Sequence, residues 1–240
     1  MIRRFLAGIV AMVGVSLTSL AEPRMVAGIT EAFMDVTLSS SVQGTIHLEH
    51  YKEGAQVKEG EVILQLDTRL EELEAQRRKQ VMEHAMMDYE GTKQLFEKSN
   101  AVSKDELRKK ETEYKVSAAE LGIAEEQLRR RKIFAPFSGS IVEILLQPGA
   151  SCEPYQPLVR LVDTTRVVFV GHIEGTAAAE LKAGQVVKIG IAGVRTPVEA
   201  TISFIAPVVD SASGLARVKA IFENADGRVR PGLAAKMILD

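Results

Sequence analysis

One short pattern, which occurs twice, decides the fold of this chain. Residues 44–66 read GTIHLEHYKEGAQVKEGEVILQL, and residues 139–161 read GSIVEILLQPGASCEPYQPLVRL. Each copy contains a β-rich run, a glycine turn and a second apolar run. Aligned without a gap, the copies keep identical residues at Gly44 and Gly139, Ile46 and Ile141, Gly54 and Gly149, Ala55 and Ala150, and Leu66 and Leu161.

This internal repeat predicts two hairpins that form one small β-sandwich, because neither half can close a hydrophobic core alone. Residues 22–68 and 133–164 are expected to form this split domain. A coincidence between two unrelated glycine-turn hairpins is the alternative. The common register of the apolar positions, and not only of the glycines, argues against coincidence.

The insert between the copies, residues 69–132, is rich in Glu, Lys, Arg, Gln and Ala and contains no proline. This composition is typical of long solvated helices. A polar break near residues 99–103 precedes Ser103, with Glu106 three residues later, which is a capping box that starts a new helix. We therefore expect an antiparallel helical hairpin, a rod of about 40 to 45 Å.

A coiled-coil seam is expected to join the two helices. The second helix carries Leu107, Tyr114, Leu121 and Leu128 at seven-residue intervals, with Ala118 and Ala124 between them. The first helix offers Leu70, Leu73, Val81, Met87 and Leu95 at less regular spacing. A hairpin folded back against the body is the alternative, but the helices have no second apolar face to dock.

Residues 165–240 contain short alternating runs that are separated by Gly, Pro, Asp and Asn, with a short helix expected at residues 176–182. Five strands in this length favour a small closed β-barrel, since closure removes exposed strand edges. The predicted fold is therefore mostly β with a long α-helical hairpin: a split β-sandwich plus a small β-barrel.

The N-terminus has the pattern of a cleaved secretory signal peptide, residues 1–21. Arg3 and Arg4 precede an apolar run at residues 5–17, and small residues follow at Ser19 and Ala21. The run of 13 residues is short for the roughly 20 that span a bilayer, so a retained membrane anchor is the alternative. The formal charge of −2 gives no reason to expect nucleic acid as a partner.

Residues for catalysis do not stand out. The four histidines form no metal-ligand pattern, and the nucleophile-elbow, Walker A and dinucleotide motifs are absent from the sequence. The single cysteine, Cys152, occupies the position of Val57 in the other copy, which favours a buried thiol over an intermolecular or reactive one. We expect no enzyme activity, no cofactor and no metal site.

Methionine thioethers are the one basis for a different function, because soft sulfur ligands bind monovalent copper or silver. Met25 and Met34 lie in an N-terminal stretch that we expect to be flexible. A metal-handling periplasmic protein that uses this pair is therefore an alternative. The methionines at 82, 86 and 87 beside His84 are better explained by packing on a helix.

Taken together, the blocks resemble the periplasmic adaptor subunits, or membrane fusion proteins, of bacterial tripartite efflux and secretion systems (HlyD- and RND-type adaptors). VQGTI with EGAQVKEGEVILQLD, and then APFSGSIVEILLQPGA, resemble the two halves of their split lipoyl-like domain, or barrel-sandwich hybrid. LKAGQVVKIGI, TISFIAPVVD and ENADGRVRPGLAAKM resemble their β-barrel. Lipoyl and biotinyl carriers share the small β fold, but their modified lysine has no counterpart at the junction that the helices occupy.

The resemblance implies a non-catalytic periplasmic scaffold that bridges an inner-membrane transporter, most simply of RND type, and an outer-membrane channel. Adaptors of type I secretion systems or ABC exporters are the nearest alternative. Neighbouring copies would pack into a homo-oligomeric ring. The hairpin tip would contact the channel through Phe96, Asn100, Val102, Ser103 and Lys104.

Two departures from the family pattern stand out. Many channel-docking adaptors carry Arg, Leu and Ser in order around the tip, and Thr92 and Lys93 stand here where the Arg is expected. Many relatives also add a membrane-proximal domain after the barrel, whereas this sequence ends at Asp240. The resemblance therefore implies either a short form or a different transporter contact.

Overall fold

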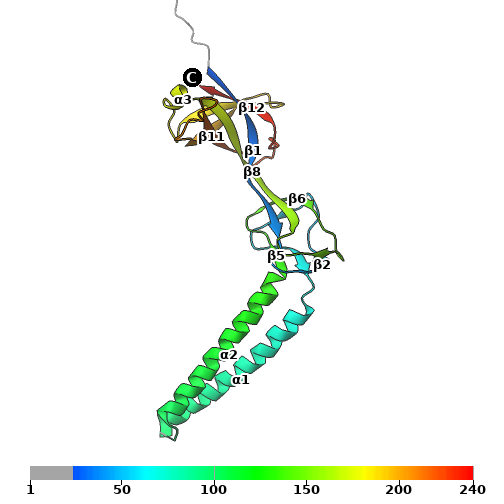
Figure 1. Ribbon diagram of the computed structural model, residues 1–240, viewed down its shortest axis with the longest axis vertical. Coiled ribbons are helices and arrows are strands. Elements are labelled where there is room, and N and C mark those ends of the chain that lie inside the picture. The colour runs from blue at the N-terminus through cyan, green and yellow to red at the C-terminus, as the bar shows by residue number, and fades with distance from the viewer. Residues whose placement is uncertain (1–23, 100, 240) are drawn as a thin grey trace, which may run out of the picture.

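The computed structural model describes residues 24–99 and 101–239 and shows an elongated molecule with three parts in a row (Figure 1). A β-barrel lies at one end, a β-sandwich in the middle and a two-helix rod at the other end. The predicted signal peptide, residues 1–21, lies outside the described residues. Among the helices that are described, none is both long and apolar enough to cross a membrane.

The β-sandwich is built from both copies of the repeat. Its short strands are β2 (Gly44–Glu49), β3 (Gln56–Val57), β4 (Val62–Leu66), β5 (Lys132–Phe134), β6 (Gly139–Ile144) and β7 (Ser151–Cys152). Two long strands, β1 (Arg24–Ser39) and β8 (Pro157–Glu174), contribute their sandwich-side ends. Strands β5, β4, β2 and β7 form one sheet, while β3 and β6 join the sheet that contains β8.

The repeat is visible in the strand register. Ile46 of β2 lies opposite Leu66 of β4, and Ile141 of β6 lies opposite Leu161 of β8 at the equivalent position. Both pairs are fully or almost fully buried and meet in one core. A register irregularity follows each isoleucine directly, so the two halves share even this local detail.

The two halves also exchange hydrogen bonds at their glycine turns. The amide of Gly54 donates to the carbonyl of Ile141 at 2.7 Å, and the amide of Gly149 donates to the carbonyl of Ile46 at 2.8 Å. Both glycines have a positive φ, +83° and +91°, which a residue with a Cβ rarely adopts. Each half therefore closes the other, as expected of a split domain.

Cys152 occupies the predicted core position. It pairs with Gly44 across β7 and β2, just as Val57 pairs with Gly139 across β3 and β6. The cysteine side chain is 2% exposed and belongs to the sandwich core. The prediction of a buried thiol is confirmed.

The β-barrel is a closed ring of six strands. Strands β1, β12 (Ala234–Leu239), β9 (Val186–Ile191), β10 (Val198–Ile205), β11 (Leu215–Glu223) and β8 follow in this order. Pairing of β1 with β8 closes the ring. Phe169, Ile189 and Met237 fill its centre with no exposed side-chain surface.

The first described residues, at the start of β1, belong to the barrel and not to the sandwich, where we predicted them. We predicted residues 22–68 in the sandwich, but Val26 pairs with Met237 and belongs to the barrel core. The same strand continues into the sandwich, where Val36 lies opposite Leu161. β1 is thus a sixth barrel strand that the sequence pattern missed, because one continuous strand serves two cores and changes register between Ala32 and Met34.

A second difference concerns the short helix of the barrel. Helix α3 (Gly175–Ala178) is one turn long: it begins one residue before the predicted range of 176–182 and ends four residues before the end of that range. Turns follow at Ala179 and Glu180, and Gly184 has a φ of +87°. The alanine-rich sequence has high helix propensity, but the chain must turn back to begin β9.

The rod consists of α1 (Arg69–Ser99) and α2 (Lys104–Arg130), which follow the predicted insert (Figure 1). With 31 and 27 residues, they are about 45 and 40 Å long. Their packing against each other is extensive, and their bases join the sandwich at β4 and β5. The rod and the barrel therefore lie at opposite ends of the molecule.

Candidate functional site at the hairpin tip

The connection between α1 and α2 is tight and locally bonded. The hydroxyl of Ser99 donates to the carbonyl of Leu95 at 2.8 Å, which satisfies a carbonyl in the last turn of α1. The amide of Ala101 donates to the same carbonyl at 3.4 Å. These bonds end α1 and turn the chain towards α2.

Ser103 starts α2 as its N-cap. Its backbone is extended, with φ −78° and ψ 156°, and its hydroxyl accepts from the amide of Glu106 at 3.1 Å. Asp105 and Glu106 place negative charge in the first turn, where the helix dipole favours it. The predicted helix start is confirmed to the residue.

The five predicted contact residues differ in exposure. Ser103 and Lys104 are exposed at the tip, whereas Phe96 and Val102 are half-buried. Asn100 lies outside the described residues. Leu95, next to Phe96, is 52% exposed and thus presents a large apolar side chain close to the turn.

The two residues where an Arg was expected, Thr92 and Lys93, differ in exposure. Thr92 is half-buried, and its hydroxyl donates to the carbonyl of Asp88 at 2.8 Å, whereas Lys93 is exposed. The hydroxyl of Thr92 is therefore used within α1. Lys93, Lys98 and Lys104 are exposed cationic side chains on the two helices near the turn.

The prediction for the α1 side of the seam was wrong. Eight of the half-buried residues of α1 recur at alternating four- and three-residue intervals, as a coiled-coil face requires, and the half-buried Glu74, Glu83 and Asp88 flank them. These eight are Glu71, Ala75, Arg78, Met82, Ala85, Tyr89, Thr92 and Phe96. Small, polar and aromatic side chains, together with Met82, thus form the inner face in place of the leucines, Val81 and Met87 that were predicted.

Polar contacts and one aromatic pair join this inner face to α2. Arg78 forms an ion pair with Glu120, and Lys110 donates to Asp88 at 2.9 Å. The hydrogen bond from Lys110 lowers the pKa of the Asp88 carboxyl. Tyr89 stacks on Tyr114, with ring centroids 6.1 Å apart and the planes within 1° of parallel.

The α2 half of the seam agrees with the prediction. Leu107, Tyr114, Leu121 and Leu128 are all half-buried, and Ala124 is buried. Their strict seven-residue interval was a sufficient signal. For α1, the spacing of Ala75, Met82, Ala85 and Tyr89 could have indicated the inner face. The leucines elsewhere on the helix are more hydrophobic and led to the wrong prediction.

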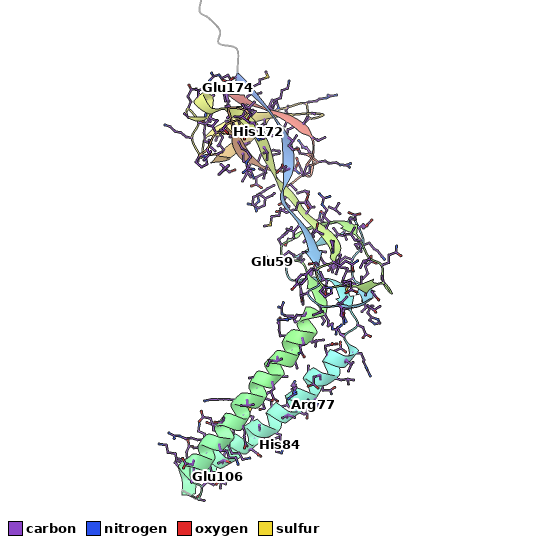
Figure 2. The ribbon with its side chains drawn as sticks, in the orientation of Figure 1. Glu59, Arg77, His84, Glu106, His172 and Glu174 are labelled. Carbon is purple, nitrogen blue, oxygen red and sulfur yellow. The ribbon has the colours of Figure 1, made fainter. Side chains whose placement is uncertain are left out.

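The apolar residues that we predicted for the α1 side of the seam face outward instead, including Met87 at 65% exposure. Leu70, Leu73, Val81 and Leu95 are 76%, 50%, 43% and 52% exposed. At 100° per residue, these four side chains lie on one side of α1, about a quarter turn from the inner face. We call them the α1 stripe; Arg77 and His84, labelled in Figure 2, lie along it.

The base of the rod is held by Arg131, directly after α2. Its guanidinium donates to the carboxylate of Glu71 at 2.5 Å and to the carbonyl of Gln43 at 3.0 Å. Beside it, the hydroxyl of Thr68 donates to Glu72 at 2.7 Å. The start of α1 and the end of α2 are therefore tied to the sandwich at one place.

The two methionines that we considered as copper or silver ligands lie far apart from each other. Met25 and Met34 lie in the regular strand β1 and not in a flexible stretch. Nine residues of extended strand place them about 30 Å apart, too far to share an ion. The alternative function based on this pair loses its structural basis.

Two family models match the chain. Residues 34–164 match the model described as RND MFP, barrel-sandwich hybrid domain. Residues 172–240 match the model described as CusB-like, beta-barrel domain. The two matches correspond to the middle and barrel parts of the fold, with the helical rod inside the first.

Curated relatives and a solved structure agree with these models. The antibiotic efflux pump periplasmic linker protein ArpA of Pseudomonas putida is 28% identical over 222 residues, which cover 86% of this chain and 60% of ArpA. The multidrug resistance protein MexA of Pseudomonas aeruginosa is 26% identical over 222 residues, covering 86% of this chain and 58% of MexA. This chain thus spans about three-fifths of the length of these relatives.

A crystal structure of a MacA-MexA chimeric protein that contains the MexA α-hairpin domain of Pseudomonas aeruginosa has the same fold. Its TM-score is 0.77 at 23% identity, with coverage of 91% of this chain and 79% of the chimera. The barrel-sandwich model alone matches more than half of the chain. The chain therefore belongs to the RND membrane fusion protein family.

Proposed function

We propose that this chain is the periplasmic adaptor of an RND-type efflux pump, a non-catalytic scaffold between an inner-membrane transporter and an outer-membrane channel. One observation carries the proposal: a helical rod of about 40 Å extends from a split sandwich, opposite the barrel. A small domain gains little stability from a solvated rod, so the rod serves to span a distance. The similarity to ArpA, an efflux pump periplasmic linker protein, and to MexA, a multidrug resistance protein, supports the same function.

The two ends of the molecule have different roles in this proposal. The barrel, at the end of the molecule opposite the rod (Figure 1), contacts the transporter. The tip contacts the channel through Phe96, Val102, Ser103 and Lys104, together with Asn100. The RND class named by the family model that matches residues 34–164 favours an RND transporter over an ABC exporter.

Neighbouring copies pack side by side along their rods. The α1 stripe leaves four large apolar side chains in water, and α2 has its own outward pair, Val116 and Ile123, at 53% and 61% exposure. Contact between two different faces of one rod is heterologous, so repetition of that contact leads to a ring when the rotation closes. The stripe thus supports a homo-oligomeric ring.

Crosslinking in cells tests the tip. A photoreactive residue at Ala101 should crosslink to the outer-membrane channel, and Ser103→Asp with Lys104→Glu should abolish that crosslink and reduce export. Both replacements suit a helix start, because Asp is a good N-cap and negative charge is favourable in the first turn. The fold should therefore survive the change.

Lys79→Glu is the matched control, since Lys79 is exposed on α1 but far from the tip. It should leave crosslinking and export at the level of the unmodified chain. If the tip double variant crosslinks and exports as well as this control, the tip does not dock a channel.

A further inference from the structure

A cleft lies between the barrel and the sandwich, on the outside of the β1 and β8 strands that connect them. Its volume is about 710 Å³. Residues from both parts line it: Ile29, Arg230 and Pro231 on the barrel side, and Val142, Arg160 and Val162 on the sandwich side. This volume falls within the range of small-molecule sites, which often lie at domain interfaces.

The apolar surface of the cleft is accessible. Ile29 is 49% exposed and Val142 is 48% exposed, so these two β-branched side chains, one from each part, are half in water. Val162 forms a buried floor between them. A ligand with an apolar portion would remove this surface from water.

The barrel-side wall is preformed by buried hydrogen bonds. The side-chain amide of Asn224 donates to the carbonyls of Thr164 and Val229, both at 2.9 Å, and its oxygen accepts from the Val229 amide at 3.0 Å. The amide of Gly232 donates to the carbonyl of Thr30 at 2.6 Å. These bonds fix both sides of the segment that carries Arg230 and Pro231.

The sandwich-side wall carries a fixed guanidinium. Arg160 donates to both oxygens of Asp35, at 2.9 and 2.5 Å, and this pair holds the pKa of Asp35 below its usual value. The two bonds use two of the five N–H donors of a guanidinium, so donors remain for another acceptor. The carboxylate of Asp35 is already occupied by this pair.

The four charged side chains that line the cleft, Arg160, Arg230, Glu31 and Asp35, sum to zero, so it is the unused hydrogen-bond donors that favour a ligand with an acidic group. Arg230 and Glu31 also line the cleft, whereas the ion pairs nearby are Arg160 with Asp35 and Arg228 with Asp226. Glu31 contributes one carboxylate as an acceptor outside the Arg160–Asp35 pair. Arg230 contributes a guanidinium as a donor, and Arg160 contributes the N–H groups that Asp35 does not use. The cleft thus has more hydrogen-bond donors than acceptors.

We propose that this cleft binds a small amphiphilic organic anion, whose apolar part lies on Ile29, Val142 and Pro231 and whose acidic group accepts hydrogen bonds from Arg230. A preformed, largely apolar cleft with a few convergent polar groups is the usual form of a ligand site. Ligand binding in this cleft is independent of channel docking. The cleft lies on the barrel side of the sandwich, whereas the hairpin tip lies at the far end of the rod, which extends from the other side (Figure 1).

Amide NMR of the isotope-labelled chain, titrated with decanoate below its micelle-forming concentration, tests the site. Saturable shifts should appear together at Val142 and Gly232, one on each side of the cleft. Arg230→Gln should weaken binding about fivefold or more, the loss expected for a charge-assisted hydrogen bond. Glu31→Gln should tighten binding, because it removes the opposing charge.

Arg228→Gln is the matched control. Arg228 lies two positions from Arg230 in the same loop, is exposed, pairs with Asp226 at 2.8 Å and does not line the cleft. It should bind decanoate like the unmodified chain. Equal affinities of the two arginine variants, equally tight binding of decylammonium, or shifts that do not saturate would each overturn the proposal.

Discussion

The guanidinium of Arg131 donates to the carboxylate of Glu71 at 2.5 Å, across the two helices at the base of the rod. Glu71 belongs to the first turn of α1, and Arg131 directly follows α2. A second bond joins the same guanidinium to the carbonyl of Gln43 in the sandwich. One side chain therefore ties both ends of the inserted hairpin to the domain that the insertion splits.

This pair should contribute measurably to stability. Both side chains are shielded, at 25% and 18% exposure, so their interaction is screened less than a surface pair. Arg131→Gln and Glu71→Gln, alone and combined, form a double-mutant cycle in urea unfolding. We expect a coupling free energy of about 1 to 2 kcal/mol. Additive effects of the two changes would show that the pair contributes nothing of its own.

Acid should weaken the rod through two carboxylates. The hydrogen bonds from Arg77 and Arg78 lower the pKa of Glu74 to about 2, and those from Arg129 and Arg130 lower the pKa of Glu126 to about 2. Because the pKa values in the unfolded chain are near 4.3, the stabilisation is full above about pH 4.3 and is lost as pH falls towards 2.

Circular dichroism at 222 nm between pH 5 and pH 2 measures this effect. The decrease in helicity should be small, because the groups are exposed, and smaller still in high salt. In Glu74→Gln with Glu126→Gln, this part of the acid transition should disappear. An unchanged transition would assign the acid sensitivity to other groups.

The glycine at 171 should tolerate no side chain. A Cβ there would lie 2.7 Å from the buried ring of Phe169 and 3.1 Å from Val26. Gly171→Ala should therefore destabilise the barrel by about 1 to 3 kcal/mol in urea unfolding, the usual cost of overpacking. Gly190→Ala is the control, because the nearest atom to its new Cβ, the carbonyl oxygen of Lys236, would be 3.8 Å away. Equal losses in both variants would contradict this account.

The cap at Ser103 should set the stability of the start of α2. Ser103→Ala removes the acceptor of the Glu106 amide and should cost about 1 kcal/mol of hairpin stability. Ser103→Asp should keep it. Thermal melts followed by helical circular dichroism distinguish them, and the Asp variant also shows whether the tip variants used for crosslinking stay folded.

The α1 stripe should matter for association and not for the folded monomer. Leu73→Gln with Val81→Gln replaces half-exposed side chains, so the melting temperature should change little. Self-association measured by sedimentation velocity should decrease. Met82→Ala, which truncates the inner face of α1, should do the reverse by lowering the melting temperature. Association of the double variant at the level of the unmodified chain would exclude the stripe as the contact.

The sequence alone determined the features that depend on local pattern or symmetry. The repeat predicted the pairing of the two halves and the burial of Cys152, because equivalent positions in a symmetric pair of hairpins have equivalent surroundings. The cap at Ser103 and the absence of proline from residues 69–132 located the helices, because caps and breakers act through neighbouring residues. The turn between the two helices could be located for the same reason.

Only the tertiary structure decided features that depend on which surfaces meet. Val26 entered the barrel because one long strand crosses two domains, which no local alternation reveals. Leu70 and Leu95 faced water because the position of α2, fixed at the base by Arg131, selects the inner face of α1. The cleft beside Arg230 likewise exists only where barrel and sandwich approach each other. Burial is a property of the assembled chain, and hydrophobicity by itself does not state what a side chain will contact.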